Sequence, residues 1–317
     1  MKKRRGDTPA DTINFTVSSI NHHKVMKSII ISIMLLSGIV FLGGCSDTVS
    51  PVAFPYKGNI FYSNGGEVSR LQLSNQVSST LFTNARHPDV ANNGKILAVE
   101  ISPRTRLIFS DLTGANRETV LAGVDYTGPK SRQYMNKPRL SYDQRYVVYE
   151  SDNVYNPNSY VVSASDGTLI AIIGDYDKKQ PMVSPSWAPD GSIVVAGWKS
   201  MNNGIYKVSP DFSSIVRIDP NLTNVDEPSV SPDGKFIAFT RDGQVWIMGI
   251  DGSNPTQLYV GDKYFRMPTW SPDSKYIASV QTNGTGRIHI FDIDAKSVAE
   301  VPGVHYVSPE HQLCWRY

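Results

Sequence analysis

Short runs of hydrophobic residues separated by turn residues make up most of this sequence. Runs such as 96–101, 146–150, 193–196 and 236–240 are four to six residues long and rich in Val, Ile and aromatic residues. A second short run and a turn containing Asp or Gly follow most of them. This pattern is typical of many short strands joined by turns. It predicts an all-β protein and argues against a helical bundle.

A nine-residue element recurs and marks the first strand of each unit. Its copies start at residues 51, 87, 137, 184, 227, 267 and 304, and EPSVSPDGK at 227–235 is the clearest. Pro at its second position suits the first residue of a strand, because Pro has no N–H to donate. The fourth position is always large and apolar and the third is usually small or polar, as in a strand with one packed face. A turn such as Pro232-Asp233-Gly234 then follows.

The repeat length predicts the architecture. The starts are 36 to 50 residues apart, and each unit has room for four short strands. That is the signature of a β-propeller blade. Seven starts define six repeats, which predicts a six-bladed propeller of four-stranded antiparallel blades. An open ring would expose strand edges, so the copy at 304–312, continued by 313–317, is expected to pair with the N-terminal strand. Seven blades, with a thin one made by the tail and 47–55, are the alternative.

The repeat resembles the TolB-type (PD40, WD40-like) propeller repeat. Residues 227–259 match best, 267–301 and 184–219 match well, and the resemblance covers nearly all of 51–317. It implies a propeller domain at 51–317 without the extra α/β domain of TolB. It also implies protein binding, since the TolB propeller binds a partner lipoprotein, Pal, through its funnel mouth.

The N-terminal 44 residues are predicted to be an extension and a signal peptide. Residues 28–44 form an apolar run about 26 Å long as a helix, short for a bilayer core of about 30 Å. Lys24 and Lys27 precede the run, as in a secretory signal. Leu42-Gly43-Gly44-Cys45 resembles the bacterial lipobox, which implies acylation of Cys45, a short tether at 45–50 and an outer-membrane location facing the periplasm. A retained membrane anchor is the alternative, and either Met1 or Met26 is the start.

Charge and cysteine content exclude several classes of function. The 44 N-terminal residues hold six Lys and Arg and two acids, so the remainder has 25 basic and 27 acidic residues. This near-neutral body argues against a nucleic-acid groove. Two cysteines, Cys45 and Cys314, exclude a disulfide scaffold and a multi-Cys zinc site. No Gly-x-Ser-x-Gly elbow, phosphate-binding glycine loop or His-Glu-x-x-His motif occurs. We therefore predict no enzyme activity, no metal and no cofactor.

The start of the inner strands is the expected binding site. In propellers these residues point to the mouth of the central funnel, and the candidates here are Arg86, His87, Lys137, Arg139, Glu227, Arg266 and Met267. Arg and Met are common at protein interfaces. His87 and His305 both lie near the start of inner strands, where a metal pair is conceivable, but two histidines without a fixed carboxylate partner do not make a metal site. The hypothesis is a monomeric, lipid-anchored envelope protein whose propeller binds a protein partner in the periplasm. The alternative is a glycan-binding or glycan-cleaving propeller similar to oligogalacturonate lyases.

Overall fold

The computed structural model describes most of one compact unit, Ala53–Tyr317. The described residues are 54–102, 105–123, 135–151, 158–175, 180–197, 203–219, 222–284, 286–304 and 306–317. The expected signal at 1–44, Cys45 and the tether at 45–50 lie outside them, as does His305. Strands are the regular elements of this part of the chain. Nothing helical in it has the length and hydropathy that a membrane crossing requires.

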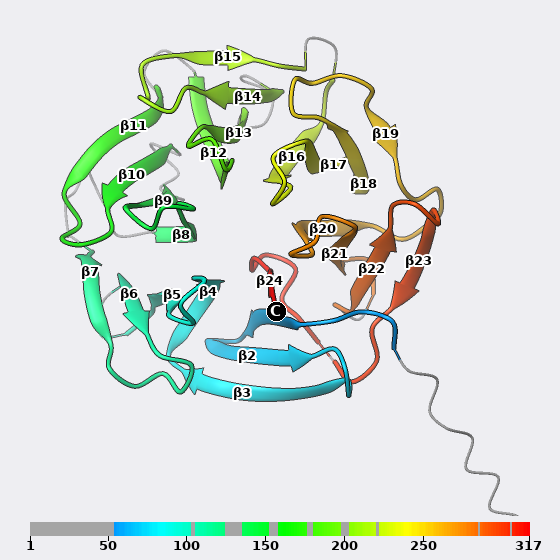
Figure 1. The fold of residues 1–317 in the computed structure, drawn as a ribbon, viewed down its shortest axis with the longest axis horizontal. Coiled ribbons are helices and arrows are strands. Elements are labelled where there is room, and N and C mark those ends of the chain that lie inside the picture. Colours follow the sequence, from blue (N-terminus) through cyan, green and yellow to red (C-terminus); the bar gives the residue numbers. More distant parts are fainter. Residues whose placement is uncertain are drawn as a thin grey trace, which may run out of the picture. The chain divides into compact units, whose positions relative to one another are not determined.

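Four of the sheets contain four antiparallel strands each, and Figure 1 shows them placed around a common centre. The first is ordered β24 (Cys314–Arg316), β1 (Asn59–Asn64), β2 (Glu67–Gln72), β3 (Val77–Thr83). The second is β4 (Ala85–Val90), β5 (Ile96–Glu100), β6 (Arg106–Ser110), β7 (Glu118–Ala122). The other two are β16 (Val225–Val230), β17 (Phe236–Arg241), β18 (Gln244–Gly249), β19 (Thr256–Gln257) and β20 (Phe265–Trp270), β21 (Tyr276–Gln281), β22 (Ile288–Asp292), β23 (Ser297–Glu300).

The fifth sheet differs from the expectation of six separate blades. It has eight strands, β8 (Met135–Leu140), β9 (Tyr146–Ser151), β10 (Ser159–Ser163), β11 (Leu169–Asp175), β12 (Gln180–Trp187), β13 (Ile193–Gly197), β14 (Ile205–Val208) and β15 (Ile215–Arg217). The outer strand β11 and the inner strand β12 join because Gly174 pairs with Pro181 and Asp175 with Gln180. The structure therefore has four separate four-stranded blades and one continuous eight-stranded sheet. It has no seventh blade in the described residues.

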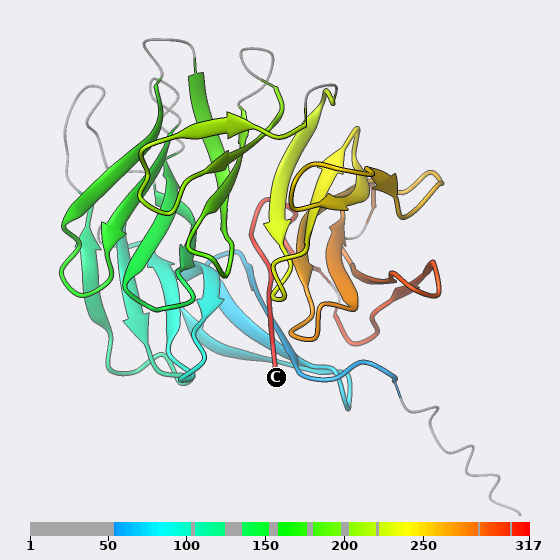
Figure 2. The same ribbon diagram turned by 45° about the horizontal axis from the view of Figure 1, so that its top comes forward.

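The ring closes through the two ends of the propeller, as predicted, with the closing strand in the expected continuation at 313–317 and not in the copy at 304–312. Antiparallel β24 pairs with β1 through Asn59 with Arg316, Ile60 with Trp315 and Phe61 with Cys314. The expected closing copy, 304–312, contributes no strand among its described residues. Its Ser-Pro turn signal predicts a strand there, but β1 pairs with the residues that follow this turn. Figure 2 shows the red C-terminal segment lying between the first and last sheets.

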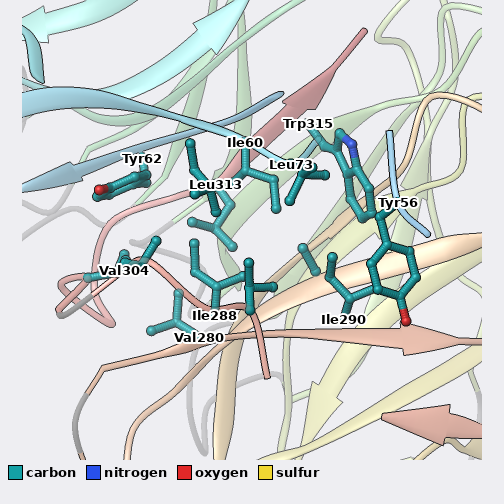
Figure 3. Packing of buried hydrophobic residues seen from close by; sticks show 14 residues of the cluster. Tyr56, Ile60, Tyr62, Leu73, Val280, Ile288, Ile290, Val304, Leu313 and Trp315 are labelled. Atoms are coloured by element: carbon teal, nitrogen blue, oxygen red, sulfur yellow. The ribbon is translucent and has the colours of Figure 1, made fainter. Parts of the chain in front are cut away.

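A hydrophobic cluster packs the closing point of the ring (Figure 3). It combines Ile60 of β1, Val280 of β21, Ile288 and Ile290 of β22, and Trp315 of β24. Each of these side chains is at most 1% exposed. The interface between the first and last blades therefore resembles a domain core, and burial of its apolar surface stabilises the closed ring.

The turns after the inner strands follow the predicted chemistry. Gly234 has a φ of 73°, and its N–H donates to the carbonyl of Ser231 at 2.8 Å. The Asp233 carboxylate accepts from the backbone N–H of Lys235 at 3.1 Å. Asp190 and Asp273 accept in the same way from Ser192 and Lys275. These aspartates hold their own turns, as the sequence indicated.

Candidate functional site

The inner strands carry a recurring distortion that the sequence did not predict. Pro was expected at the first residue of each inner strand, but Pro88, Pro138, Pro228 and Pro268 are fourth in theirs. The register shifts at each X-Pro pair, which is a β-bulge. The shared feature is a left-handed residue before the proline, with φ of 48–56°, in the set His87, Lys137, Ser184, Glu227 and Met267. We call these five the bulge residues.

Left-handed backbone at a non-glycine residue costs about 1–3 kcal/mol and clusters at binding sites. The strain here recurs at one position of five strands. Contacts with the surrounding blades must therefore stabilise this backbone conformation. A bulge also frees its N–H from the strand ladder. The N–H of His87 donates to Ser63 Oγ at 3.1 Å, that of Ser184 to Glu150 Oε2 at 2.9 Å, and that of Met267 to Glu227 Oε2 at 2.7 Å. Each acceptor belongs to the preceding sheet repeat, so the bulges tie neighbouring blades together.

A polar network links three inner strands at this opening. Lys137 Nζ lies 3.1 Å from Ser184 Oγ and 3.3 Å from Glu150 Oε2. The Ser184 hydroxyl also donates to Asp226 Oδ1 at 3.1 Å. Burial lowers the pKa of Lys137, but the carboxylates of Glu150 and its neighbours outweigh burial and raise it. Lys137 is therefore a fixed cation at neutral pH.

Glu227 anchors the next part of the network. Its side chain is only 3% exposed and accepts from Arg266 Nε at 2.8 Å and from the Met267 N–H. Burial and the neighbouring Asp226 raise the pKa of Glu227, and Arg266 and Lys137 act in the opposite direction. Glu227 in turn raises the pKa of Arg266. A buried carboxylate held this way is strongly positioned, because removing its partners would leave a desolvated charge.

The network borders an open pocket of about 370 Å³. Its lining includes Lys137, Ser184, Asp226 and Arg266. The Asp226 and Arg266 side chains are 46% and 41% exposed, so they present charge to solvent at the rim. We call this opening, at the starts of the inner strands, the mouth.

The structure brings together six of the seven predicted mouth residues and separates the seventh. His87, Glu227 and Met267 are buried bulge residues, and Lys137 is a partly exposed one. Arg86 and Arg266 directly precede bulge residues. Arg139 follows Pro138 and lines a different pocket, at the C-terminal ends of the inner strands.

His87 has a different histidine neighbour from the one expected. Its ring lies edge-on to the His311 ring with centroids 4.7 Å apart. Burial, then His311, Arg86 and Lys137, lower the pKa of His87 well below its ordinary value. Burial also lowers the pKa of His311. No group of three or more His, Cys, Asp or Glu side chains is placed to hold a metal ion in the described part of the chain.

Acid is expected to destabilise the ring through His87 and His311. Both have lowered pKa values when folded, so the unfolded chain binds more protons below about pH 6.5. The part of the free energy of unfolding that depends on neutral His87 and His311 is fully present above about pH 6.5. It is lost progressively as the pH falls towards about 5. Urea unfolding across this window is expected to show a smaller decline for His87→Gln than for the native protein.

His289 is the matched control for this test. It is 1% exposed, and burial lowers its pKa too, but it lies on β22 against Lys263. His289→Gln is expected to reduce the pH dependence of the free energy of unfolding less than His87→Gln does. Identical pH slopes for native protein and His87→Gln would contradict the assignment.

Several residues of the mouth were missed by sequence reasoning. Ser184 occupies the bulge position of its repeat, and Asp226 occupies the position before a bulge residue. Taking these two positions in every copy of the repeat would have identified both residues. Gln312 is 1% exposed and donates to the carbonyls of His87, Pro88 and Pro138 at 2.9–3.0 Å. Aligning Trp315 with Trp187 and Trp270 places Gln312 at the bulge position of the closing strand. Glu150 lies on β9, next to an inner strand, and no sequence motif marks it as part of the mouth.

Antiparallel blades placed around a common centre define a β-propeller. The model of the TolB beta propeller domain, PD40, matches residues 74–302, more than half of the chain. The chain belongs to this family.

Known proteins agree with this placement. The Tol-Pal system protein TolB of Francisella tularensis subsp. tularensis (strain SCHU S4 / Schu 4) is 28% identical over 209 residues, which cover 62% of this chain and 45% of the relative. The chain thus spans less than half the length of that relative. The crystal structure of TolB from Acinetobacter baumannii has a TM-score of 0.64 at 16% identity and covers 92% of this chain and 71% of that one. An oligogalacturonate lyase in complex with manganese has a TM-score of 0.50 at 12% identity, covering 74% and 70%. Both structures show a shared fold alone.

Proposed function

We propose that this protein is a lipid-anchored component of the bacterial cell envelope whose propeller binds a protein partner in the periplasm. In this proposal the chain acts as a binding platform and not as an enzyme. The eight-stranded sheet acts as two blades, so that six four-stranded units surround the mouth. Cys45 carries the lipid and holds the propeller at the outer membrane.

One observation carries the binding role: the strained bulge residues and their charged neighbours converge on the mouth. Five inner strands keep left-handed residues there, and Asp226 and Arg266 present partly exposed charges beside a pocket of about 370 Å³. Charges fixed by a buried network pre-organise a surface for a partner, because less ordering is needed on binding. The Francisella relative is named as a Tol-Pal system protein, and the proposal extends that kind of assembly to this chain.

Photo-crosslinking in cells that make the protein tests the site. A photoreactive amino acid at exposed Thr223, just before β16 at the mouth, is expected to capture a specific envelope protein. The same group at Val77, 55% exposed on outer strand β3, is the control and is expected to capture none. Arg266→Ala is expected to reduce the Thr223 adduct. Equal capture from both positions, or none at Thr223, would refute a partner at the mouth.

The same cells test the anchor. Cys45→Ser is expected to move the protein from the membrane fraction to the soluble fraction and to abolish incorporation of labelled fatty acid, since stable anchoring requires acyl chains. Retention in the membrane without label would support the alternative, a retained apolar anchor at 28–44.

A further inference from the structure

A second pocket lies at the C-terminal ends of the inner strands and is chemically unlike the mouth. It has a volume of about 190 Å³ and is lined by the last residues of inner strands β4, β8, β12, β16 and β20 and by the turns after them. Its floor includes the third position of each repeat, which the sequence pattern identified as small or polar. Those residues are Asp89, Arg139, Ser186, Ser229 and Thr269.

The charges of this pocket do not balance. Its lining contains two arginines, Arg139 and Arg316, and one carboxylate, Asp89. Asp89 is already engaged: Oδ2 accepts from the Leu140 N–H at 2.8 Å, and Oδ1 lies 3.3 Å from Arg316 Nη2. Arg139 Nη1 is 3.8 Å from the same oxygen, beyond hydrogen-bond distance. The lining therefore has a net charge of +1.

Arg139 keeps donors available to the pocket. Its Nη1 donates to the carbonyl of Leu313 at 3.1 Å. No hydrogen bond joins its Nε or Nη2 to another described residue, and its side chain is 21% exposed. A guanidinium presents its N–H groups in a planar fork that matches a carboxylate. The Nε and Nη2 edge of that fork therefore has no partner among the described residues, and Arg139 lines the pocket.

The remaining walls suit the stem of a small acid. The Trp187 and Trp270 indoles and the rings of Pro232 and Pro272 supply apolar surface. Tyr142 is 44% exposed, and its hydroxyl is a further donor without a partner among the described residues. Asp233 acts on Tyr142 more weakly than Asp89 does, and it is paired with Lys235 at 3.6 Å. The rim therefore adds little repulsion.

We infer that this pocket binds a carboxylate on a compact apolar stem, held by Arg139 and Tyr142 and packed against the two indoles. A monoanion neutralises the net charge of +1, which a phosphate dianion would exceed. The volume admits a small organic acid or the last residue of a peptide, both of which present the same carboxylate. The inference goes beyond the proposed partner at the mouth and does not depend on it.

Isothermal titration of the full-length protein tests the site with defined probes. N-acetyl-leucine serves as the free acid, and N-acetyl-leucinamide is its neutral control. An N-acetylated tripeptide that ends in leucine, with a free or an amidated C-terminus, tests binding of a peptide end. The acids are expected to bind about tenfold or more tightly than the amides, because a hydrogen bond to a charged group is lost in the amide. A preference for the tripeptide acid over the single residue assigns the site to chain termini, and the reverse preference to free acids.

Variants assign the binding to the named residues. Arg139→Gln is expected to weaken acid binding about tenfold or more, and Arg139→Lys less. Tyr142→Phe, which removes only the hydroxyl and no structural contact, is expected to weaken binding about threefold. Arg145→Gln, an exposed cation outside this lining, is the matched control and is expected to bind as the native protein.

Four results would overturn the inference, the first three of which concern the acids and the variants. Those three are absence of binding by every acid up to about 10 mM, equal binding of acids and amides, and unchanged acid affinity in both Arg139→Gln and Tyr142→Phe. Equal or tighter binding of inorganic phosphate would also overturn the assignment to a carboxylate.

Discussion

Trp315→Ala is expected to lower the free energy of unfolding by about 3–5 kcal/mol, the range for removing a large aromatic side chain from a core. Trp315 is 1% exposed, and its ring packs against Tyr276 and Tyr56 with centroids 6.3 and 6.5 Å away. Its indole N–H donates to the carbonyl of Lys57 at 2.9 Å, which the substitution leaves without this donor. Because β24 is the strand that closes the ring, the loss weakens the junction between first and last blades. Urea unfolding followed by circular dichroism measures the change.

Tyr317→Ala is the matched control for ring closure. Tyr317 is also an aromatic residue of the tail but is 70% exposed, so its removal is expected to change stability by less than about 0.5 kcal/mol. If Trp315→Ala were as stable as Tyr317→Ala, the tail would not be closing the ring.

Glu227→Ala is expected to cost about 3 kcal/mol, because it leaves a buried donor and a cation without their partner. The Met267 N–H lies in a bulge and bonds to Glu227 Oε2, while Arg266 bonds to Oε1. Glu227→Gln keeps an acceptor for Met267 and is expected to lose less. Urea unfolding midpoints of the native protein, Glu227→Gln and Glu227→Ala at neutral pH give the order of their stabilities.

An exposed ion pair provides the comparison for Glu227. Glu118 lies 3.1 Å from Lys95 with its side chain 66% exposed, and Glu118→Ala is expected to cost about 1 kcal/mol or less. Equal losses in Glu118→Ala and Glu227→Ala would mean that the mouth network does not hold the blades together.

Much of the fold was predictable because its signals are local. The Pro-Asp-Gly turn at 232–234 and the apolar run at 236–240 require only neighbouring residues, and both occur where the sequence placed them. The residue before a proline, by contrast, normally favours extended backbone. Sequence reasoning therefore had no basis to expect the left-handed Glu227 or Lys137. It grouped Arg139 with Lys137, whereas the two line different pockets.

By itself, the sequence determined the repeating strand-and-turn unit and the closure of the ring by the chain ends, since repetition and turn chemistry act over a few residues. Only the tertiary structure decided that closure uses 314–316 without 304–312, that β11 and β12 join two repeats into one sheet, and that Glu150, Ser184 and Asp226 complete the mouth. These features depend on contacts between residues far apart in the chain. Their partners are chosen by distance and burial in the folded protein, which no short stretch of sequence specifies.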